Sequence, residues 1–441
     1  MKKSSQSASR IAFVSLGCFK NTVDSEVLAG MLQERGMEIV SEYENPDWLA
    51  VNTCGFIRDA KEESIEEILA ALEKKEKGEI GKLAVFGCLV QRYHRELRST
   101  FAQADILWGV NDTEDLADAI ASGQRREYPD RRPFLYSERH RRPVFTTVNS
   151  SFIKISEGCD MGCSFCAIPL IRGAFRSRTI PSIVKEAEGL KKRGVEELNL
   201  ISQNSSHFGR DRGDRSRLPA LLAELSGLGF RWLRVLYLMP EEITPDILAG
   251  FEQPTVLPYF DLPFQHVAPA VLKRMKRGGS VRQNLRLVRE IRGRFPAAVL
   301  RSTFIVGFPG EREDDFAALL DFCAESALER IGVFAFSPEE NTAAFALKGR
   351  RRPRVIEERK KRLLDMAARN TRRFNRSLIG KTVDFLPLAP WSGGSTIGRI
   401  WAQAPEVDGH CRIGVACSEG LPMPAVRITG FQDEMLHGEK A

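Results

Sequence analysis

The sequence lacks any long hydrophobic run. No apolar stretch in the 441 residues reaches the roughly 18 residues that a membrane-spanning helix needs. The polar N-terminus, MKKSSQSASR, also lacks the apolar core and small-residue cleavage site of a secretion signal. We therefore expect a cytoplasmic protein with no membrane partner, in which residues 1–9 form a flexible tail.

Cysteine is scarce and unevenly distributed. The chain has nine cysteines, an odd number, which together with the missing export signal argues against a disulfide framework. Metal binding or catalysis is the favoured use of cysteine in such a chain. The spacing of the cysteines therefore carries most of the functional information.

Alternating strand and helix patterns predict an α/β protein in three parts. Residues 10–122 contain three short apolar segments that each end in cysteine, separated by amphipathic helices, and predict a parallel α/β domain. The polar, Arg- and Pro-rich residues 123–144 resemble a linker. Residues 145–376 carry about six more strand–helix units, enough for a partial (β/α) TIM-like barrel, and end in a basic helix. Residues 378–441 change to short strands and turns, which predicts a small OB-like β-barrel.

The net charge of +7 is concentrated in one segment. Residues 345–376 carry thirteen Lys/Arg and three Asp/Glu, a net of +10, so the rest of the chain sums to −3. This segment either lies near phosphates or forms a solvated helix face, and the sequence leaves both interpretations open. Residues 378–441 carry five Lys/Arg and seven Asp/Glu, which does not suit an RNA-binding barrel and favours docking on a basic protein.

Cys159, Cys163 and Cys166 form a C-x3-C-x2-C run directly after the predicted strand SFIKIS. Three thiolates this close can hold three corners of one four-iron cluster, because thiolates are the usual ligands of such clusters. The fourth iron is then left for a small chelating ligand. A structural zinc site is the alternative, but it takes four ligands, often in two spaced pairs, and no second pair lies nearby.

Cys18, Cys54 and Cys88 lie 36 and 34 residues apart, but each ends a predicted strand. Strand ends of a parallel sheet fall on the same edge, so three thiolates there again suit a cluster with one open iron. Three buried structural cysteines are the alternative. The remaining cysteines have no partners at metal-binding spacing and are expected to be core or surface thiols: Cys323, Cys411 and Cys417.

The motif EGCDMGCSFC resembles the radical S-adenosylmethionine superfamily. This resemblance implies that the open iron binds the amino and carboxylate groups of S-adenosylmethionine, whose reductive cleavage gives a 5′-deoxyadenosyl radical. Residues 10–438 are similar to the methylthiotransferases of this superfamily, which have a second cluster in an N-terminal domain and a C-terminal TRAM barrel. We therefore expect two 4Fe-4S clusters: a catalytic one on Cys159, Cys163 and Cys166, and a second one on Cys18, Cys54 and Cys88.

Several motifs resemble the RimO branch of these enzymes. SLGCFKNTVDSE is similar to the SLGCPKNLVDSE of that branch and unlike the YGCQMN type that modifies adenosine in tRNA. SEGCDMGCSFCAIPLIRGAFRSR, LPFQH, SPEENT and GRIWAQAPEVDG favour the same branch. The resemblance implies sulfur insertion and methylation at the β-carbon of an aspartate in small-subunit ribosomal protein S twelve, on the ribosome or its precursor. We also expect an electron donor such as flavodoxin or ferredoxin, and a monomer.

Two alternative functions stay open at this point. The first is a tRNA adenosine methylthiotransferase, and the second, more distant, is a non-catalytic ribosome-binding iron–sulfur protein. Three residues depart from the family pattern: Phe19 replaces a proline, Asn204 replaces an aspartate, and Phe264 replaces a leucine. None of these changes removes a cysteine, but substrate contacts near residues 203–209 become less secure.

The turn IVGFPGE at residues 305–311 follows a strong apolar strand. In the superfamily this place contacts S-adenosylmethionine, so the resemblance implies cofactor binding by Gly307, Gly310 and Glu311. Gln203, which follows an earlier strand, is a further candidate contact. The alternative is a tight strand-to-helix turn with Glu311 in the first turn of the helix.

Four more residues near these motifs have either a functional or a structural role. His266 is a proton donor, a substrate contact, or a structural hydrogen-bonding residue. Arg172, Arg176 and Arg178 follow the cysteine loop and bind a carboxylate of cofactor or substrate, or else form surface salt bridges.

Overall fold

The computed structural model describes residues 8–126, 128–130, 132–145, 149–213, 215–417 and 425–441. Most of the predicted tail, residues 1–7, lies outside this range. The chain divides into two compact units. Unit 1 takes the described residues up to Phe145 together with Ser156–Met161 and Cys166–Arg178, and unit 2 takes the rest. The predicted domain bounds stay a prediction. Within the described ranges no helix is both long and apolar enough to cross a bilayer.

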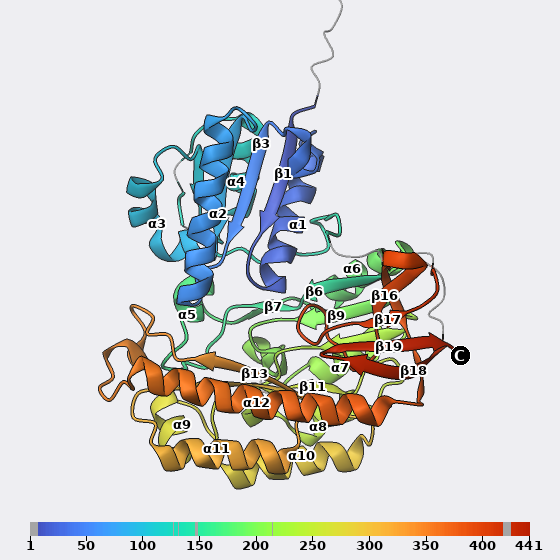
Figure 1. Ribbon diagram of the computed structural model, residues 1–441. Helices are drawn as coiled ribbons and strands as arrows, with labels where there is room; N and C mark the ends of the chain where they lie inside the picture. The colour runs from blue at the N-terminus through green and yellow to red at the C-terminus, as the bar shows by residue number, and fades with distance from the viewer. Residues whose placement is uncertain (1–7, 127, 131, 146–148, 214, 418–424) are drawn as a thin grey trace, which may run out of the picture. The chain divides into compact units, whose positions relative to one another are not determined.

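Unit 1 is built on a five-stranded parallel sheet in the order β2-β1-β3-β4-β5 (Figure 1). This is the strand order of flavodoxin-like folds, in which ligands bind where the order reverses, between β1 and β3. The strands predicted before each cysteine are present. The elements are β1 (Arg10–Ser15), α1 (Phe19–Glu34), β2 (Glu38–Ile39), β3 (Trp48–Thr53), α2 (Arg58–Glu76), β4 (Lys82–Gly87), α3 (Cys88–Thr100), β5 (Ile106–Trp108), α4 (Thr113–Ser122), β7 (Ser156–Glu157), α5 (Ile168–Arg172) and β8 (Arg176–Ser177).

The core of unit 1 lies between this sheet and its helices. Every residue of β3 is buried, as expected for a central parallel strand covered on both faces. Helix α2 buries Ile68 and Ala71, three residues apart on one face, against Leu49 and Val85 of the sheet. This packing fixes the carboxyl ends of β1, β3 and β4, where the three cysteines follow.

Unit 2 contains a partial parallel barrel of six strands. The strands form two three-stranded sheets, β6-β9-β10 and β11-β12-β13. Backbone bonds link the two sheets, from Leu233 N to Thr255 O (2.7 Å) and from Leu238 N to Asp261 O (2.9 Å). The elements are β6 (Ser150–Lys154), α6 (Ile180–Lys192), β9 (Glu197–Ile201), α7 (Leu218–Ser226), β10 (Trp232–Val235), α8 (Pro245–Gly250), β11 (Tyr259–Asp261), α9 (Pro269–Met275), α10 (Val281–Arg294), β12 (Val299–Val306), α11 (Glu313–Ser326), β13 (Arg330–Ala335) and α12 (Pro353–Leu378).

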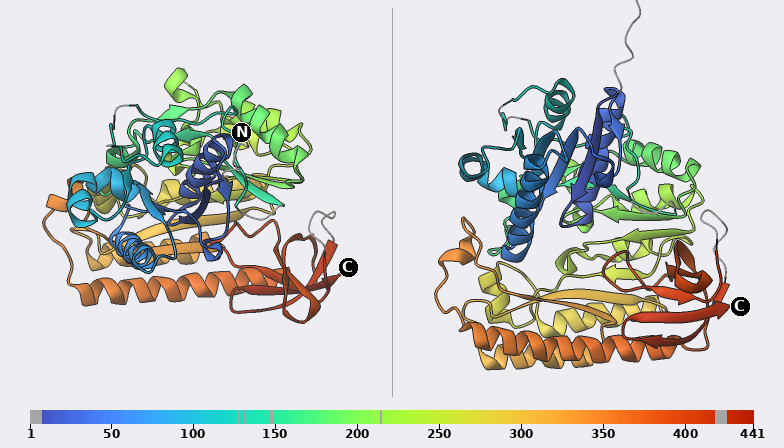
Figure 2. Two further views of the ribbon diagram at one scale, coloured as in Figure 1. Left: turned by 90° about the horizontal axis from the view of Figure 1, so that it is seen from above. Right: turned by 45° about the horizontal axis from the view of Figure 1, so that its top comes forward.

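Helix α12 leads into a six-stranded C-terminal sheet in the order β14-β18-β19-β17-β16-β15 (Figure 2). The strands are β14 (Thr382–Asp384), β15 (Leu386–Trp391), β16 (Ser395–Arg399), β17 (Cys411–Ile413), β18 (Ala425–Gln432) and β19 (Met435–Lys440). Strands β14 and β15 follow one another in the chain but occupy opposite edges, so the sheet must curl. The predicted small β-barrel architecture is therefore confirmed, whereas its assignment as a TRAM domain stays a prediction.

A buried ion network joins this curled sheet to the partial barrel. Arg399 of β16 and Arg234 of β10 both donate to the carboxylate of Glu197 on β9, and the Ser150 hydroxyl donates to it at 2.7 Å. All four side chains are buried. Burial acts to raise the pKa of Glu197, but the two guanidinium groups outweigh burial and lower this pKa to about 2.

We expect Glu197→Gln to lower the free energy of unfolding by about 3–5 kcal/mol, because two buried guanidinium groups lose their carboxylate. The folded-state pKa lies below the unfolded value, so the stabilisation is complete above pH 4.5 and is lost as the pH falls toward 2. Chemical denaturation of both chains at pH 7 and pH 3 measures the effect. A variant as stable as the wild type at pH 7 would contradict the network's role.

Candidate functional site

The structure gathers Cys18, Cys54 and Cys88 at the carboxyl edge of the unit 1 sheet. Cys18 precedes α1 in an extended conformation, Cys54 follows β3, and Cys88 begins α3. A Cβ on Gly17, which has a φ of +87°, would lie 2.9 Å from the Cys54 sulfur, so glycine is required for this close approach. The charges of Cys88 and Cys18 both act on Cys54. The predicted convergence of the three strand ends is therefore present.

Burial dominates the chemistry of the Cys54 and Cys88 thiols. It raises the pKa of Cys54 to about 12, and the nearby Cys88 adds to the effect. Burial also raises the pKa of Cys88, while the guanidinium of Arg172 opposes this shift. Cysteine binds metal as thiolate, so occupation of this site by a metal would release protons.

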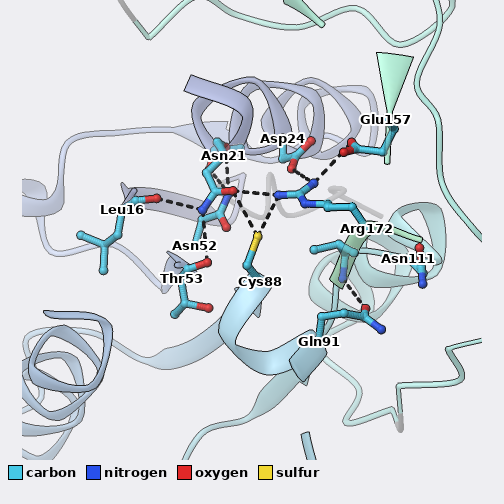
Figure 3. Close-up of polar contacts among 12 residues, drawn as sticks. Leu16, Asn21, Asp24, Asn52, Thr53, Cys88, Gln91, Asn111, Glu157 and Arg172 are labelled. Atoms are coloured by element: carbon cyan, nitrogen blue, oxygen red, sulfur yellow. Dashed lines mark hydrogen bonds and ion pairs between the residues drawn. The ribbon is translucent and has the colours of Figure 1, made fainter. Parts of the chain in front are cut away.

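A polar network surrounds Cys88 (Figure 3). Arg172, the last residue of α5, donates to the Cys88 sulfur at 3.0 Å and to Asn21 Oδ1 at 2.8 Å. Its other terminal nitrogen contacts the carboxylates of Asp24 at 2.6 Å and Glu157 at 3.4 Å. The network thus presents a paired cation directly to a cysteine sulfur.

Two asparagines that the sequence analysis missed tie the cysteine loops together. Asn21 Nδ2 donates to the carbonyl oxygens of Leu16 at 2.9 Å and Thr53 at 3.2 Å. Asn52 Nδ2 donates to the Asn21 carbonyl at 2.8 Å and to Ser25 Oγ at 3.0 Å. These bonds fix the loop after β1 against the end of β3. Their only sequence signal is that each asparagine lies within three residues of a cysteine.

The C-x3-C-x2-C loop is shared between the two units, with Cys159 and Cys166 in unit 1. Gly158 has a φ of +82°, and a Cβ there would lie 2.1 Å from the Ala174 carbonyl oxygen, so the loop can close only with glycine. Ile168 N donates to the Cys166 sulfur at 3.4 Å. Both cysteines are thus held by local backbone contacts.

Within unit 1, the segment after Cys166 packs beside a cysteine of the other group. Ala167, the next residue, and Ile171 of α5 share a buried apolar cluster with Cys88. The segment that leaves the first cysteine group therefore packs on the second.

Cys163 lies in unit 2 and is hydrogen-bonded to Arg277, another residue that the sequence analysis missed. Burial raises the pKa of Cys163, and the guanidinium opposes this shift. Arg277 also donates to both oxygens of Glu241, at 2.6 and 2.8 Å. No sequence signal points to Arg277 or Glu241, since neither of these two residues lies in a recognisable motif. A buried arginine, paired with a partly exposed glutamate, therefore supports this cysteine.

The predicted cofactor turn at 305–311 lies beside the cysteine loop within unit 2. The ring of Phe308 meets that of Phe165 edge to face, with centroids 6.3 Å apart. Gly307 has a φ of +77° and Gly310 a φ of +86°. The close approach that these glycines allow is to the side chains of Ile356 and Arg274. The sequence analysis predicted that these glycines allow the close approach of a ligand. Cofactor binding by Gly307 and Gly310 stays a prediction.

Glu311 is completely buried and holds this turn together. Its carboxylate accepts the backbone N–H of Gly307 at 2.5 Å and of Phe308 at 3.0 Å, and Arg359 of α12 donates to it at 2.8 Å. Burial raises the pKa of Glu311, opposed by Arg359. These contacts match the alternative of a tight strand-to-helix turn, and they leave a cofactor contact by Glu311 untested.

The other candidate residues are mostly engaged inside the protein. Gln203 is buried after β9. His266 is completely buried, its Nδ1 accepts the Ala268 N–H at 3.0 Å, and burial lowers its pKa to about 4, so it is neutral. Arg178 lies over the ring of Tyr136 at 4.2 Å. Arg176 donates to the backbone carbonyls of Ala174 and Arg172, at 3.0 and 3.2 Å.

The three departures from the family pattern have local explanations. Phe19 is buried at the first position of α1, where proline is tolerated but not required. Asn204 donates to Glu242 at 3.0 Å, and His207 bonds the other oxygen of Glu242 at 2.8 Å. An aspartate at 204 would face that carboxylate with like charge. Phe264 packs in a buried aromatic group with Phe304 and Phe322.

The donor set fits iron–sulfur clusters better than a single metal ion. No three His, Cys, Asp or Glu side chains in the described part of the chain gather closely enough to hold one ion. A four-iron cluster takes one thiolate for each iron, so its ligands stand farther apart than ligands around one ion. All nine cysteines are free thiols, and Cys323 and Cys411 are buried outside both groups. The edge with Cys18, Cys54 and Cys88 therefore offers the three thiols that a cluster with one open iron requires. The buried cation of Arg172 lies beside one of them, Cys88.

Comparisons with known proteins agree with this geometry. Residues 10–109 match the uncharacterized protein family UPF0004, and residues 153–323 match the radical SAM superfamily. The ribosomal protein uS12 methylthiotransferase RimO of Syntrophomonas wolfei is 41% identical over 90% of this chain and 92% of its own length. The RimO of Pelobacter propionicus is 38% identical over 98% of this chain and 97% of its own length.

The chain belongs to the RimO family.

The predicted resemblance to RimO is thereby confirmed. Cys18, Cys54 and Cys88 all fall in the first matched segment, and the C-x3-C-x2-C run falls in the second. Solved structures support the fold. The radical S-adenosylmethionine methyltransferase TsrM of Kitasatospora setae superposes with a TM-score of 0.55 at 16% identity, covering 76% of this chain and 77% of TsrM. The radical enzyme OxsB gives 0.51 at 11% identity, covering 81% of this chain and 56% of OxsB.

Proposed function

We propose that this RimO-family enzyme replaces a hydrogen on the β-carbon of an aspartate in ribosomal protein uS12 with a methylthio group. The observation that carries the proposal is the 38–41% identity to uS12 methylthiotransferases over nine-tenths or more of the chain. The two groups of three cysteines supply the donors that such chemistry needs.

The cofactors in this proposal are two 4Fe-4S clusters and S-adenosylmethionine. Cys159, Cys163 and Cys166 would hold the cluster whose open iron takes S-adenosylmethionine, and Cys18, Cys54 and Cys88 would hold the second. When bound, these groups supply radical formation, sulfur delivery and the methyl group. The protein places Arg277 beside Cys163 and Arg172 beside Cys88. Gln203, Gly307, Gly310 and Glu311 complete the proposed cofactor site.

Further partners follow from this chemistry. Radical formation consumes an electron, so the enzyme needs a low-potential donor such as flavodoxin or ferredoxin. A ribosomal substrate supports our proposal that the enzyme is cytoplasmic. We include a monomeric state in the proposal, since all the proposed donors lie in one chain.

The surface of the C-terminal sheet supports a protein substrate over tRNA. Asp384 pairs with Arg231 at 2.5 Å, Asp408 is buried against Tyr259, and Glu439 pairs with Arg427. Much of the negative charge counted in the sequence is therefore used internally. Among the described residues of this C-terminal part, the remaining exposed charges are close to neutral and give no basic surface for tRNA phosphates.

The basic segment of the sequence supports modification on the ribosome. Helix α12 exposes four arginines in its last three turns: Arg369, Arg372, Arg373 and Arg376. Arg369 contacts Met366 and Arg373 contacts Asn370, and none of the four arginines has a carboxylate partner in the described residues. The chain has no acidic residue between Asp365 and Asp384. Arginines of this kind suit the phosphates of ribosomal RNA around the substrate protein.

Replacing these four arginines with glutamine is expected to weaken binding to small ribosomal subunits but leave modification of free uS12 little changed. With four phosphate contacts, wild-type affinity should fall about 10²-fold between 50 and 200 mM salt, and the variant should respond much less. Filter binding over this salt range gives, for each chain, the slope of log affinity against log salt concentration. A control lacking the exposed Arg282 and Arg286 of α10 should keep the wild-type slope. Equal slopes in all three chains would exclude α12 as the phosphate-binding surface.

A deletion strain tests the proposed function. Mass spectrometry of its ribosomal proteins and tRNA nucleosides should show uS12 without the methylthio group and tRNA unchanged. Loss of a methylthio mark from tRNA with intact uS12 would instead favour the tRNA enzyme. A non-catalytic iron–sulfur protein would bind ribosomes but form no 5′-deoxyadenosine with S-adenosylmethionine and dithionite.

A further inference from the structure

Arg172 has an unusual set of partners for a buried arginine. Its side chain is only 4% exposed, and one arm of the guanidinium already has two carboxylates, Asp24 and Glu157. The second arm is directed at the Cys88 sulfur and Asn21 Oδ1. A purely structural ion pair would be complete with the carboxylates alone. The contact with sulfur therefore requires its own explanation.

The hydrogen bonds at Cys88 depend on its protonation. As a thiol, Cys88 donates to Asn21 Oδ1 at 3.5 Å. A thiolate that binds iron cannot donate, so this bond is lost, whereas the N–H of Arg172 can still donate to the sulfur. Within the described residues, the guanidinium of Arg172 then remains as a hydrogen-bond donor to the sulfur of Cys88 as a metal ligand.

The position of Arg172 in the chain connects the two cysteine groups. Helix α5 begins two residues after Cys166 and ends at Arg172, where Gly173 turns the chain with a φ of +72°. Ala167 and Ile171 of the same segment pack against Cys88. The short segment from Ala167 to Arg172 thus connects the last cysteine of one group to the arginine that contacts the Cys88 sulfur.

The charge on Arg172 is permanent. A guanidinium stays protonated in proteins, and here it is also paired with the carboxylates of Asp24 and Glu157. Hydrogen bonds to cluster sulfurs and the local charge both set the reduction potential of an iron–sulfur cluster. A cation next to a ligand sulfur favours the reduced cluster, which carries one more negative charge.

We propose that Arg172 is a positioning residue for the second cluster: it holds the Cys88 sulfur in place and raises the reduction potential of the cluster bound there. This inference rests on the proposed function, because it assumes a cluster on Cys18, Cys54 and Cys88. It adds to that function a residue of the first cysteine loop that controls the second site.

The test uses a full-length chain with Cys159, Cys163 and Cys166 replaced by alanine, so that only the second cluster can form. Arg172→Gln and Arg172→Lys are made in this background. After anaerobic reconstitution, iron content and an EPR-monitored redox titration are measured. At a fixed potential, we expect the ratio of reduced to oxidised cluster to fall about tenfold in Arg172→Gln, a shift of 59 mV to more negative potential for one electron. Arg172→Lys keeps the positive charge, so its reduction potential should lie between those of Arg172→Gln and the parent chain.

Arg142 provides a matched control. It is a buried arginine of unit 1 that pairs with Glu26 on α1, the helix that carries Asn21 and Asp24. Arg142→Gln should lower stability but leave the potential unchanged. If Arg172→Gln titrates like its parent, the inference is overturned. If both glutamine variants lose iron equally, the role of Arg172 is only structural and the inference is again overturned. Loss of iron in Arg172→Gln alone supports it.

The proposed function fails in a different way. If the parent chain without the first cysteine group binds no iron, the second cluster itself is absent and the proposed two-cluster function is wrong. If the parent chain binds iron but Arg172→Gln has the same reduction potential as the parent, only the inference about Arg172 is overturned. The proposed two-cluster function is then unaffected.

Discussion

Replacing Cys163 with alanine is expected to abolish both 5′-deoxyadenosine formation and methylthiolation. Cys163 is one of three closely spaced thiols, and Arg277 with its partner Glu241 holds it in place. A cluster with one ligand missing cannot hold S-adenosylmethionine at an open iron in the same way. Iron content should fall from about eight to about four atoms per chain, because the second cluster is kept. Iron analysis and chromatography of the nucleoside product measure both effects.

Cys417→Ser is the control for this experiment. Cys417 is partly exposed and lies outside both cysteine groups, and its contact to Thr396 is made by the backbone N–H. This variant should keep about eight iron atoms and full activity. If Cys163→Ala still cleaves S-adenosylmethionine, the C-x3-C-x2-C run is not the radical site.

Replacing Cys88 with alanine is expected to separate the two halves of the reaction. The radical site keeps all its cysteines, so 5′-deoxyadenosine should still form. The second site loses a thiol and the partner of Arg172, so methylthiolated uS12 should not form. Iron content should again be about four atoms per chain. Measurement of the nucleoside and the uS12 peptide in one reaction shows whether the two steps separate.

The same experiment can fail in an informative way. A Cys88→Ala chain that retains eight iron atoms and full methylthiolation would show that Cys18, Cys54 and Cys88 are structural cysteines, the alternative that the sequence left open. A chain that also loses 5′-deoxyadenosine formation would show that the two sites do not act independently, because Ala167 and Ile171 pack on Cys88.

The positions of the cysteines could be predicted because they depend on local pattern. Strands β1, β3 and β4 are continuous apolar segments of parallel sheet, and in such a sheet consecutive strand ends share one edge. Short elements such as β5 (Ile106–Trp108) and the final strand β19 (Met435–Lys440) were not predicted, because three residues carry too little pattern and the sequence MLHGEK does not alternate regularly.

The partners of the cysteines could not be predicted, because they depend on contacts distant in sequence. Arg172 meets Asp24 across 148 residues and Cys88 across 84, and Glu311 meets Arg359 across 48. A motif gives the residue type at such positions but not the partner. For this reason the roles of Arg172 and Glu311 were left open between ligand binding and internal pairing. The structure gives both residues partners inside the protein. One partner of Arg172 is Cys88, which is itself a proposed ligand of the second cluster.

The most direct test of the whole account is a competition in one anaerobic reaction. The reconstituted wild-type chain is incubated with S-adenosylmethionine, dithionite, small ribosomal subunits lacking the modification and unmodified tRNA, and the products are identified by mass spectrometry. The account predicts a methylthio group on an aspartate of uS12, with 5′-deoxyadenosine released and tRNA unchanged. A methylthio group on tRNA adenosine, or 5′-deoxyadenosine with no modified uS12, would contradict it.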